Sequence, residues 1–182
     1  MACEASDNGP FGEWQRFIPL EPVLEFGNGS LQKDCRVSLE NLPRHPWFLE
    51  ANDPEMALCC LSALWLFQGD LEESHRISQS IPTVIGSYLH GIMHREEGDF
   101  SNAKYWFRKA GSLSCWAELE VRLTGDPGIL PQHQAVLGDS FNSIQLVDFV
   151  SRVDEGEKNS LARVAYWELY TVFEYCFRQI RS

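Results

Sequence analysis

The chain has 182 residues, of which 44% are hydrophobic and six are tryptophan, which is enough to bury a sizeable core in one domain. Its 15 basic and 26 acidic residues give a net charge of −11 and exclude a nucleic-acid backbone as the main partner, because that role needs a basic surface. No apolar run reaches the roughly 18 residues of a membrane span, and the first residues lack signal-peptide features, so the sequence predicts a cytoplasmic protein with no membrane partner.

Residues 1–50 are predicted to form an irregular apolar arm that packs on a helical domain of residues 51–182. Prolines and glycines interrupt the segment throughout, so long regular elements are not expected there, and residues 27–29 are predicted to turn. The segment is nevertheless too apolar for a disordered tail, with Trp14, Phe17 and Trp47 among its aromatic residues.

Asp53 and Pro54 form a strong helix start, with Asp53 as the cap and Pro54 in the first helical position. The helix that follows is apolar on almost every side, which predicts an element buried all round. It contains Cys59 and Cys60. Because the six cysteines are scattered and none has zinc-finger spacing, we expect free, mostly buried thiols.

Residues 85–97 and 99–110 are predicted to be two helices joined by a tight turn. Gly98 is expected to end the first in a left-handed conformation, and Asp99 to cap the second. The first helix carries an apolar stripe of Ile85, Tyr88 and Ile92 at helical spacing. The opposite stripe is small and polar.

The run from Gly98 to Ala110 resembles the second-helix signature of tetratricopeptide and Sel1-like repeats. The residues at that family's small and aromatic positions are Gly91, Gly98, Phe100, Ala103, Phe107 and Ala110. His90 and His94 depart from the family pattern, and the proline after the second helix is missing. The resemblance covers about one repeat of ~34 residues and implies stacked helical hairpins. The His-Gly-Ile-Met-His segment also resembles a group of uncharacterised proteins, which implies no activity.

A loose internal repeat accompanies this resemblance. The Gly-Asp pair at Gly69 recurs at Gly98, 29 residues later, and a helix is predicted after each, the first over 71–80. A third pair at Gly125 is followed by Pro127, so the repeat is predicted to break there. Further helices are predicted over 113–123, 140–153 and 159–181, with a loop over 125–135 and the last helix closing one end of the stack.

The polar stripe holds the sharpest candidate site. His90, His94 and Glu97 lie on one helix face, and two histidines at i, i+4 with a carboxylate suit a divalent metal ion or acid-base catalysis. His75 and Glu72 on the preceding helix are further candidates, His75 only if it converges with His94. The alternative interpretation is that both imidazoles are hydrogen-bonded in a tight helix interface. The segment from His90 to His94 is not an HExxH motif, because Gly91 stands where that motif has a glutamate.

The apolar stripe predicts an interaction groove formed by Ile85, Tyr88, Ile92 and Arg95. A soluble protein rarely leaves such a stripe bare, so either a partner or another part of the chain covers it. Residues 11–48 of the arm are the expected intramolecular cover.

The sequence therefore predicts an all-α, compact helical array of about seven helices with tetratricopeptide-like hairpins. The leading functional hypothesis, from fold analogy, is a protein-interaction or scaffolding module with a protein partner. The alternative is a metal-binding protein or enzyme, hydrolytic in kind, centred on His90 and His94, with catalytic candidates His90, His94, Glu97 and His75. A small-molecule binder with a pocket between arm and helices is a third possibility.

Overall fold

The structure is a computed structural model that describes residue 14 and residues 16–19, 33–137 and 140–180. Every regular element in these residues is a helix, so the predicted all-α class is confirmed. The elements are α2 (Lys33–Asn41), η1 (Leu42–Arg44), α3 (Pro46–Leu49), α4 (Pro54–Phe67), α5 (Leu71–Ser78), α6 (Val84–Glu96), α7 (Phe100–Ala110), α8 (Trp116–Gly125), η2 (His133–Leu137), α9 (Ser143–Val150) and α10 (Lys158–Gln179).

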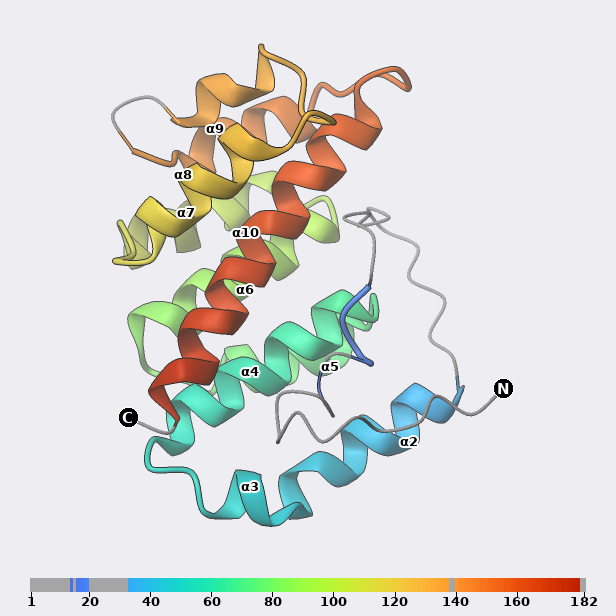
Figure 1. Cartoon of the computed structure of the whole chain (residues 1–182), viewed down its shortest axis with the longest axis vertical. Helices are drawn as coiled ribbons and strands as arrows, with labels where there is room; N and C mark the ends of the chain where they lie inside the picture. Colours follow the sequence, from blue (N-terminus) through green and yellow to red (C-terminus); the bar gives the residue numbers. More distant parts are fainter. Residues whose placement is uncertain (1–13, 15, 20–32, 138–139, 181–182) are drawn as a thin grey trace.

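The long helix α10 is the centre of the fold. It runs along much of the molecule (Figure 1) and packs against α4, α8 and α9, with Arg122 of α8 bonded to Thr171 and Glu174 in its C-terminal half. Its predicted inner face is buried in full: Ala162, Ala165, Tyr166, Leu169, Val172, Phe173 and Cys176. The prediction that this helix closes one end of a stack is wrong, because this face meets helices from both halves of the chain.

The Gly-Asp repeat corresponds to two helix starts with the same geometry. Gly69 and Gly98 both have positive φ, at 72° and 86°, a conformation that glycine adopts without strain. Asp70 and Asp99 then cap α5 and α7, each accepting a hydrogen bond from the backbone N–H three residues later, at 3.1 Å in both cases. The predicted left-handed end at Gly98 and the cap at Asp99 are confirmed.

The predicted break at the third Gly-Asp pair is also confirmed. Gly125 is the last residue of α8 and Asp126 is its C-cap, and the next described element, η2, begins only at His133. The Asp126 carboxylate accepts hydrogen bonds from Arg163 Nε at 2.9 Å and from Trp167 Nε1 at 2.6 Å, so it ties the following loop to α10.

Helix α4 is buried almost all round, as its composition predicted. Asp53 caps it by accepting from Met56 N at 3.0 Å. Four cysteines are free and buried in the described residues: Cys59, Cys60, Cys115 and Cys176. Burial raises the pKa of the Cys60 and Cys176 thiols, which keeps them protonated and unreactive. Cys3 and the side chain of Cys35 lie outside the described part.

The described part of the arm packs on α4 and α10. Trp14 and Phe17 are 2% exposed, and the Trp14 ring meets the Phe177 ring edge-on at 6.0 Å. Two hydrogen bonds hold the backbone beside them, from Gln68 Nε2 to Phe17 O at 2.7 Å and from Tyr166 Oη to Pro19 O at 3.0 Å. The rest of residues 1–32, including the predicted turn at 27–29, lies outside the described residues.

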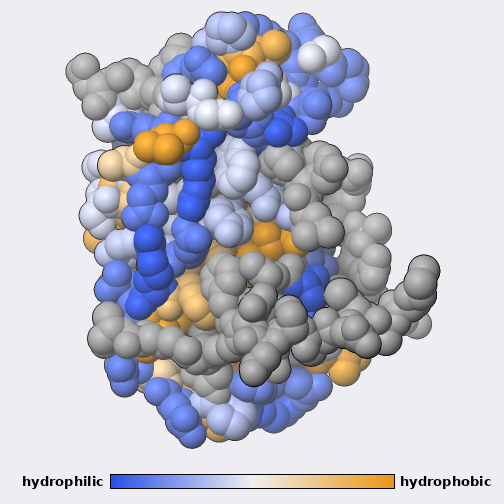
Figure 2. Space-filling model, viewed as in Figure 1, coloured by the Kyte–Doolittle hydropathy of each residue, from blue (hydrophilic) through white to orange (hydrophobic). Residues whose placement is uncertain are grey.

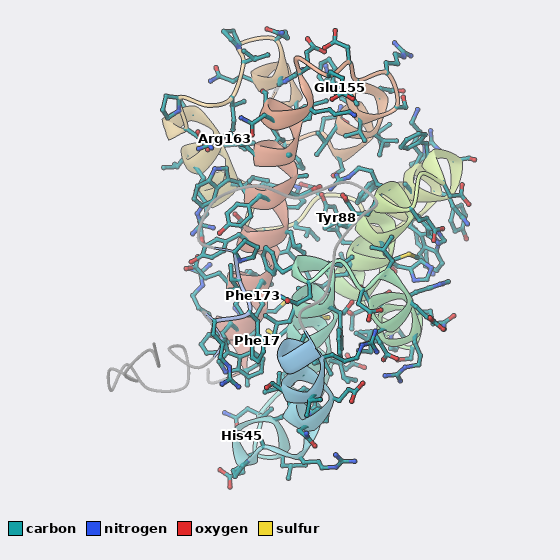
Figure 3. All side chains as sticks on the ribbon, turned by 90° about the vertical axis from the view of Figure 1, so that its right-hand side faces the viewer. Phe17, His45, Tyr88, Glu155, Arg163 and Phe173 are labelled. Carbon is teal, nitrogen blue, oxygen red and sulfur yellow. The ribbon has the colours of Figure 1, made fainter. Side chains whose placement is uncertain are left out.

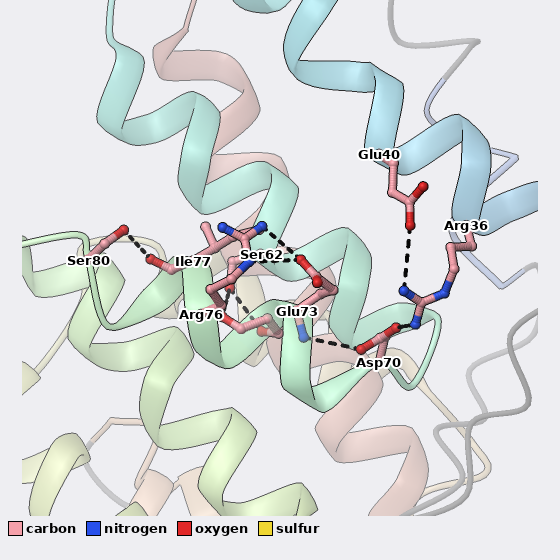
Figure 4. A network of polar contacts seen from close by, with 9 residues as sticks. Arg36, Glu40, Ser62, Asp70, Glu73, Arg76, Ile77 and Ser80 are labelled. Atoms are coloured by element: carbon pink, nitrogen blue, oxygen red, sulfur yellow. Dashed lines mark hydrogen bonds and ion pairs between the residues drawn. The ribbon is translucent and has the colours of Figure 1, made fainter.

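The arm continues into the short helices α2, η1 and α3, and an ion pair joins α2 to the helical domain. Arg36 of α2 binds the carboxylate of Asp70, the residue that also caps α5, and pairs with Glu40 on its own helix at 3.6 Å (Figure 4). The Arg36 guanidinium also lies 5.6 Å from the centre of the Trp65 ring.

Helices α6 and α7 approach closely at Gly91. A Cβ atom placed there would lie 2.9 Å from two carbons of the Phe107 ring, which is itself buried. We therefore expect Gly91→Ala to destabilise the protein by about 1–3 kcal/mol relative to Gly125→Ala, because a buried ring must move. Nothing lies within 4 Å of a Cβ at Gly125, so that variant is the control. Urea unfolding measures both, and equal stabilities would contradict the close packing.

No helix among the described residues has the length and apolar character needed to cross a bilayer. On the face drawn in Figure 2, hydrophobic residues form small separate patches among hydrophilic ones. The large hydrophobic side chains that are exposed are likewise spread over five helices: Val37, Leu49, Val84, Tyr105 and Val121.

Candidate metal centre

Three histidines from two helices converge at the α5–α6 contact. His90 and His94 lie one turn apart on α6, a helix that Thr83 caps by accepting from Gly86 N at 3.1 Å. His75 reaches them from α5, with its ring centre 4.7 Å from that of His90 and 5.4 Å from that of His94. One ring nitrogen of each histidine lies within 4.8 Å of one from each of the others. His75 therefore converges with His94, which is the arrangement under which the sequence made it a candidate ligand.

The cluster is largely closed to solvent. His90 and His94 are 3% and 6% exposed, and His75 is partly exposed. Trp106 of α7 contacts His90, with ring centres 4.3 Å apart. The ammonium group of Lys109 lies 4.2 Å from the centre of the Trp106 ring. An ion bound by the three imidazoles would therefore sit among α5, α6 and α7.

His90 is neutral at physiological pH. Burial, with the neighbouring His94, His75 and Lys109 acting in the same direction, lowers its pKa from 6.5 to about 4. A neutral imidazole keeps one unprotonated nitrogen, which is the form that binds a metal ion.

Each buried histidine also has a polar neighbour at Nδ1. Ser78 Oγ lies 3.1 Å from His90 Nδ1, and Glu97 Oε1 lies 2.6 Å from His94 Nδ1. Glu97 was predicted as a metal ligand or general base, and the structure places it against the imidazole of His94. His94, Glu97 and Asp99 also bring potential ligand atoms within 4.8 Å of one another, but both carboxylates belong to exposed residues. Glu72 is exposed and belongs to neither group.

The predicted interaction groove is not open. Ile85, Tyr88, Ile92 and Arg95 are 6%, 0%, 0% and 1% exposed. The prediction is wrong in this respect, because side chains of α8, α9 and α10 pack on the stripe. Tyr88 lies between α6 and α10 (Figure 3) and packs on Trp116 of α8, with ring centres 5.0 Å apart.

A buried polar cluster holds this stripe against α10. The Tyr88 hydroxyl donates to the carboxylate of Glu168 and lies 2.7 Å from Ser143 Oγ. Arg95 Nη2 lies 2.6 Å from Glu168 Oε2, and both side chains are fully buried. Burial also raises the pKa of the neighbouring Glu96 to about 7, although Arg95 acts in the opposite direction.

Sequence reasoning missed Ser78, Trp106 and Glu168 as neighbours of the predicted residues. Ser78 had a signal, because it lies three residues after His75 and so one turn away on the same helix. Trp106 lies at helical spacing from Ala103 and Ala110, and that spacing gives no indication that it contacts His90. Glu168 had no usable signal, because one acidic residue in an amphipathic helix is ordinarily exposed.

The chain matches no family model, and no curated protein or solved structure shows significant similarity to it.

Proposed function

We propose that this protein binds one divalent transition-metal ion through the imidazoles of His75, His90 and His94. The observation that carries the proposal is the convergence of three ring nitrogens from two helices within 4.8 Å. Two of these imidazoles are buried, and the fold holds them close together before any ion binds.

The donor set favours borderline metals. Imidazole nitrogen suits Zn²⁺, Cu²⁺, Ni²⁺ or Fe²⁺, whereas Mg²⁺ and Ca²⁺ prefer oxygen ligands. Zn²⁺ is the first ion to test, because it accepts three histidines with a fourth ligand from solvent.

Burial of the cluster favours metal binding over hydrolysis. A hydrolytic site needs a cleft in which substrate reaches the ion, whereas His90 and His94 are almost completely enclosed. The ion would link α5 to α6 and add its binding free energy to the stability of the helical domain. The scaffolding hypothesis is now supported only by the sequence resemblance to helical repeats, because the stripe that was proposed as the interaction groove is buried.

Zinc titration of metal-free protein, followed by calorimetry and thermal unfolding, tests the proposal. We expect one ion per chain, and stabilisation by about 2.7 kcal/mol when free zinc is 100-fold above Kd. Alanine at His75, His90 or His94 removes a ligand and should weaken binding by at least ~100-fold, more than the loss of an outer hydrogen bond costs.

His45→Ala is the matched control, since His45 is exposed at the start of α3, outside the cluster. It should leave affinity and stoichiometry unchanged. Zinc binding that survives loss of all three clustered histidines, or no binding by the wild-type protein, would refute the proposal.

A further inference from the structure

The proton of the Ser78 hydroxyl has an identifiable acceptor. Ser78 Oγ donates to the backbone carbonyl of His75 at 3.3 Å, and a carbonyl can only accept. The same oxygen lies 3.1 Å from His90 Nδ1. A hydroxyl has one proton, and when that proton is directed at the carbonyl, Ser78 Oγ accepts in the second contact. His90 Nδ1 therefore carries the proton, and its Nε2 keeps the lone pair.

His94 reaches the same state through a different partner. Its Nδ1 lies 2.6 Å from Glu97 Oε1, and a carboxylate accepts hydrogen bonds without donating. The proton between them belongs to His94 Nδ1, so in the neutral ring it is Nε2 that keeps the lone pair. Such a contact between a carboxylate and the outer nitrogen of a histidine is usual around protein-bound zinc, where it fixes the ring and raises its basicity.

We infer that Ser78 and Glu97 are positioning residues. They accept hydrogen bonds from the Nδ1–H groups of His90 and His94, which leaves Nε2 of each ring as the nitrogen that binds the metal ion. Glu97 accordingly acts on the ion through His94 and is not itself a ligand. The inference about donors rests on the proposed metal binding, whereas the two tautomers are properties of the metal-free protein.

Long-range ¹H–¹⁵N NMR of metal-free protein at neutral pH tests the tautomers directly. We expect both His90 and His94 to be protonated at Nδ1. In Glu97→Ala the proton of His94 should move toward Nε2, the position that a free imidazole side chain favours in water, while His90 stays unchanged. Ser78→Ala should have the reverse effect. Protonation of either wild-type ring at Nε2 would overturn the inference.

Zinc affinity and the ¹⁵N shifts of the zinc-loaded protein test the donor assignment. Glu97→Ala and Ser78→Ala should each weaken zinc binding about 10–100-fold while Nε2 remains the coordinating nitrogen. Asp99→Asn is the control for Glu97, because it removes a carboxylate from the same turn yet keeps a good helix cap. It should leave the affinity unchanged.

The outcomes separate the two proposals. Coordination through Nδ1 would overturn the positioning role. A loss in Asp99→Asn equal to that in Glu97→Ala would also overturn it, because it would point to Glu97 and Asp99 as ligands. Nδ1 protonation in a protein that takes up no zinc would support the two hydrogen bonds and refute metal binding.

Discussion

Replacement of Arg95 by methionine is expected to lower the free energy of unfolding by about 3–5 kcal/mol, among the largest effects of any single change in this protein. Arg95 Nη2 lies 2.6 Å from Glu168 Oε2, and both side chains are 0% exposed. The variant leaves the Glu168 carboxylate buried without its cation. Urea unfolding at neutral pH measures the change.

A second substitution distinguishes loss of charge compensation from loss of packing. In Arg95→Met/Glu168→Met both buried charges are gone, so the double variant should recover a substantial part of the lost stability. The control is Arg178→Met, which removes an exposed pair with Glu118 and should cost less than about 1 kcal/mol. A double variant no more stable than Arg95→Met would show that the charge pair is not the cause.

The second large effect is expected from pH, in the metal-free protein, where His90 and Glu96 act in opposite directions. The pKa of His90 falls from 6.5 to about 4 on folding. As the pH drops from 6.5 to about 4, the imidazole is therefore protonated in the unfolded chain but not in the folded one, and the folded state loses stability. The pKa of Glu96 rises from 4.5 to about 7, so the folded chain holds a proton that the unfolded chain has lost, and stability falls as the pH rises. Each contribution is on the order of 3 kcal/mol at full size.

Between pH 4.5 and 6.5 these two contributions largely cancel, and single variants should reveal them. Relative to wild type, Glu96→Gln should become progressively less stable as the pH is lowered through this window, because the effect of His90 remains. His90→Gln should become less stable as the pH is raised, because the effect of Glu96 remains. Unfolding curves at several pH values give both slopes, and slopes of the same sign would contradict the assignment.

Local features of the sequence predicted the helices from α4 to α10 and placed their ends within about three residues of those observed. Asp53, Asp70 and Asp99 cap their helices through a side-chain oxygen, and glycine ends a helix where φ must be positive. These outcomes depend on residues within one turn of each other. The pairing of His90 and His94 on one face of α6 is local for the same reason, since residues four apart on a helix are neighbours.

The site as a whole depends on packing that no local pattern specifies. His75 could have pointed to solvent, and the angle between α5 and α6 brings it to His90. Glu97 sits at the C-terminal cap of α6, where its side chain reaches the outer nitrogen of His94, and sequence spacing alone could not separate that arrangement from metal ligation.

Periodicity and capping act over a few residues, and they were enough to predict the all-α class, the buried α4 and the histidine face of α6, but not α2, α3 or the observed ends of α8 and α9. Tertiary structure alone decided what each helix face meets. The stripe of Tyr88, Ile92 and Arg95 became interior, because α10 is long enough to cross the molecule and places Glu168 against it. The orientation of one helix against another follows from the packing of all their side chains, so contacts between residues 80 positions apart could not be predicted from spacing.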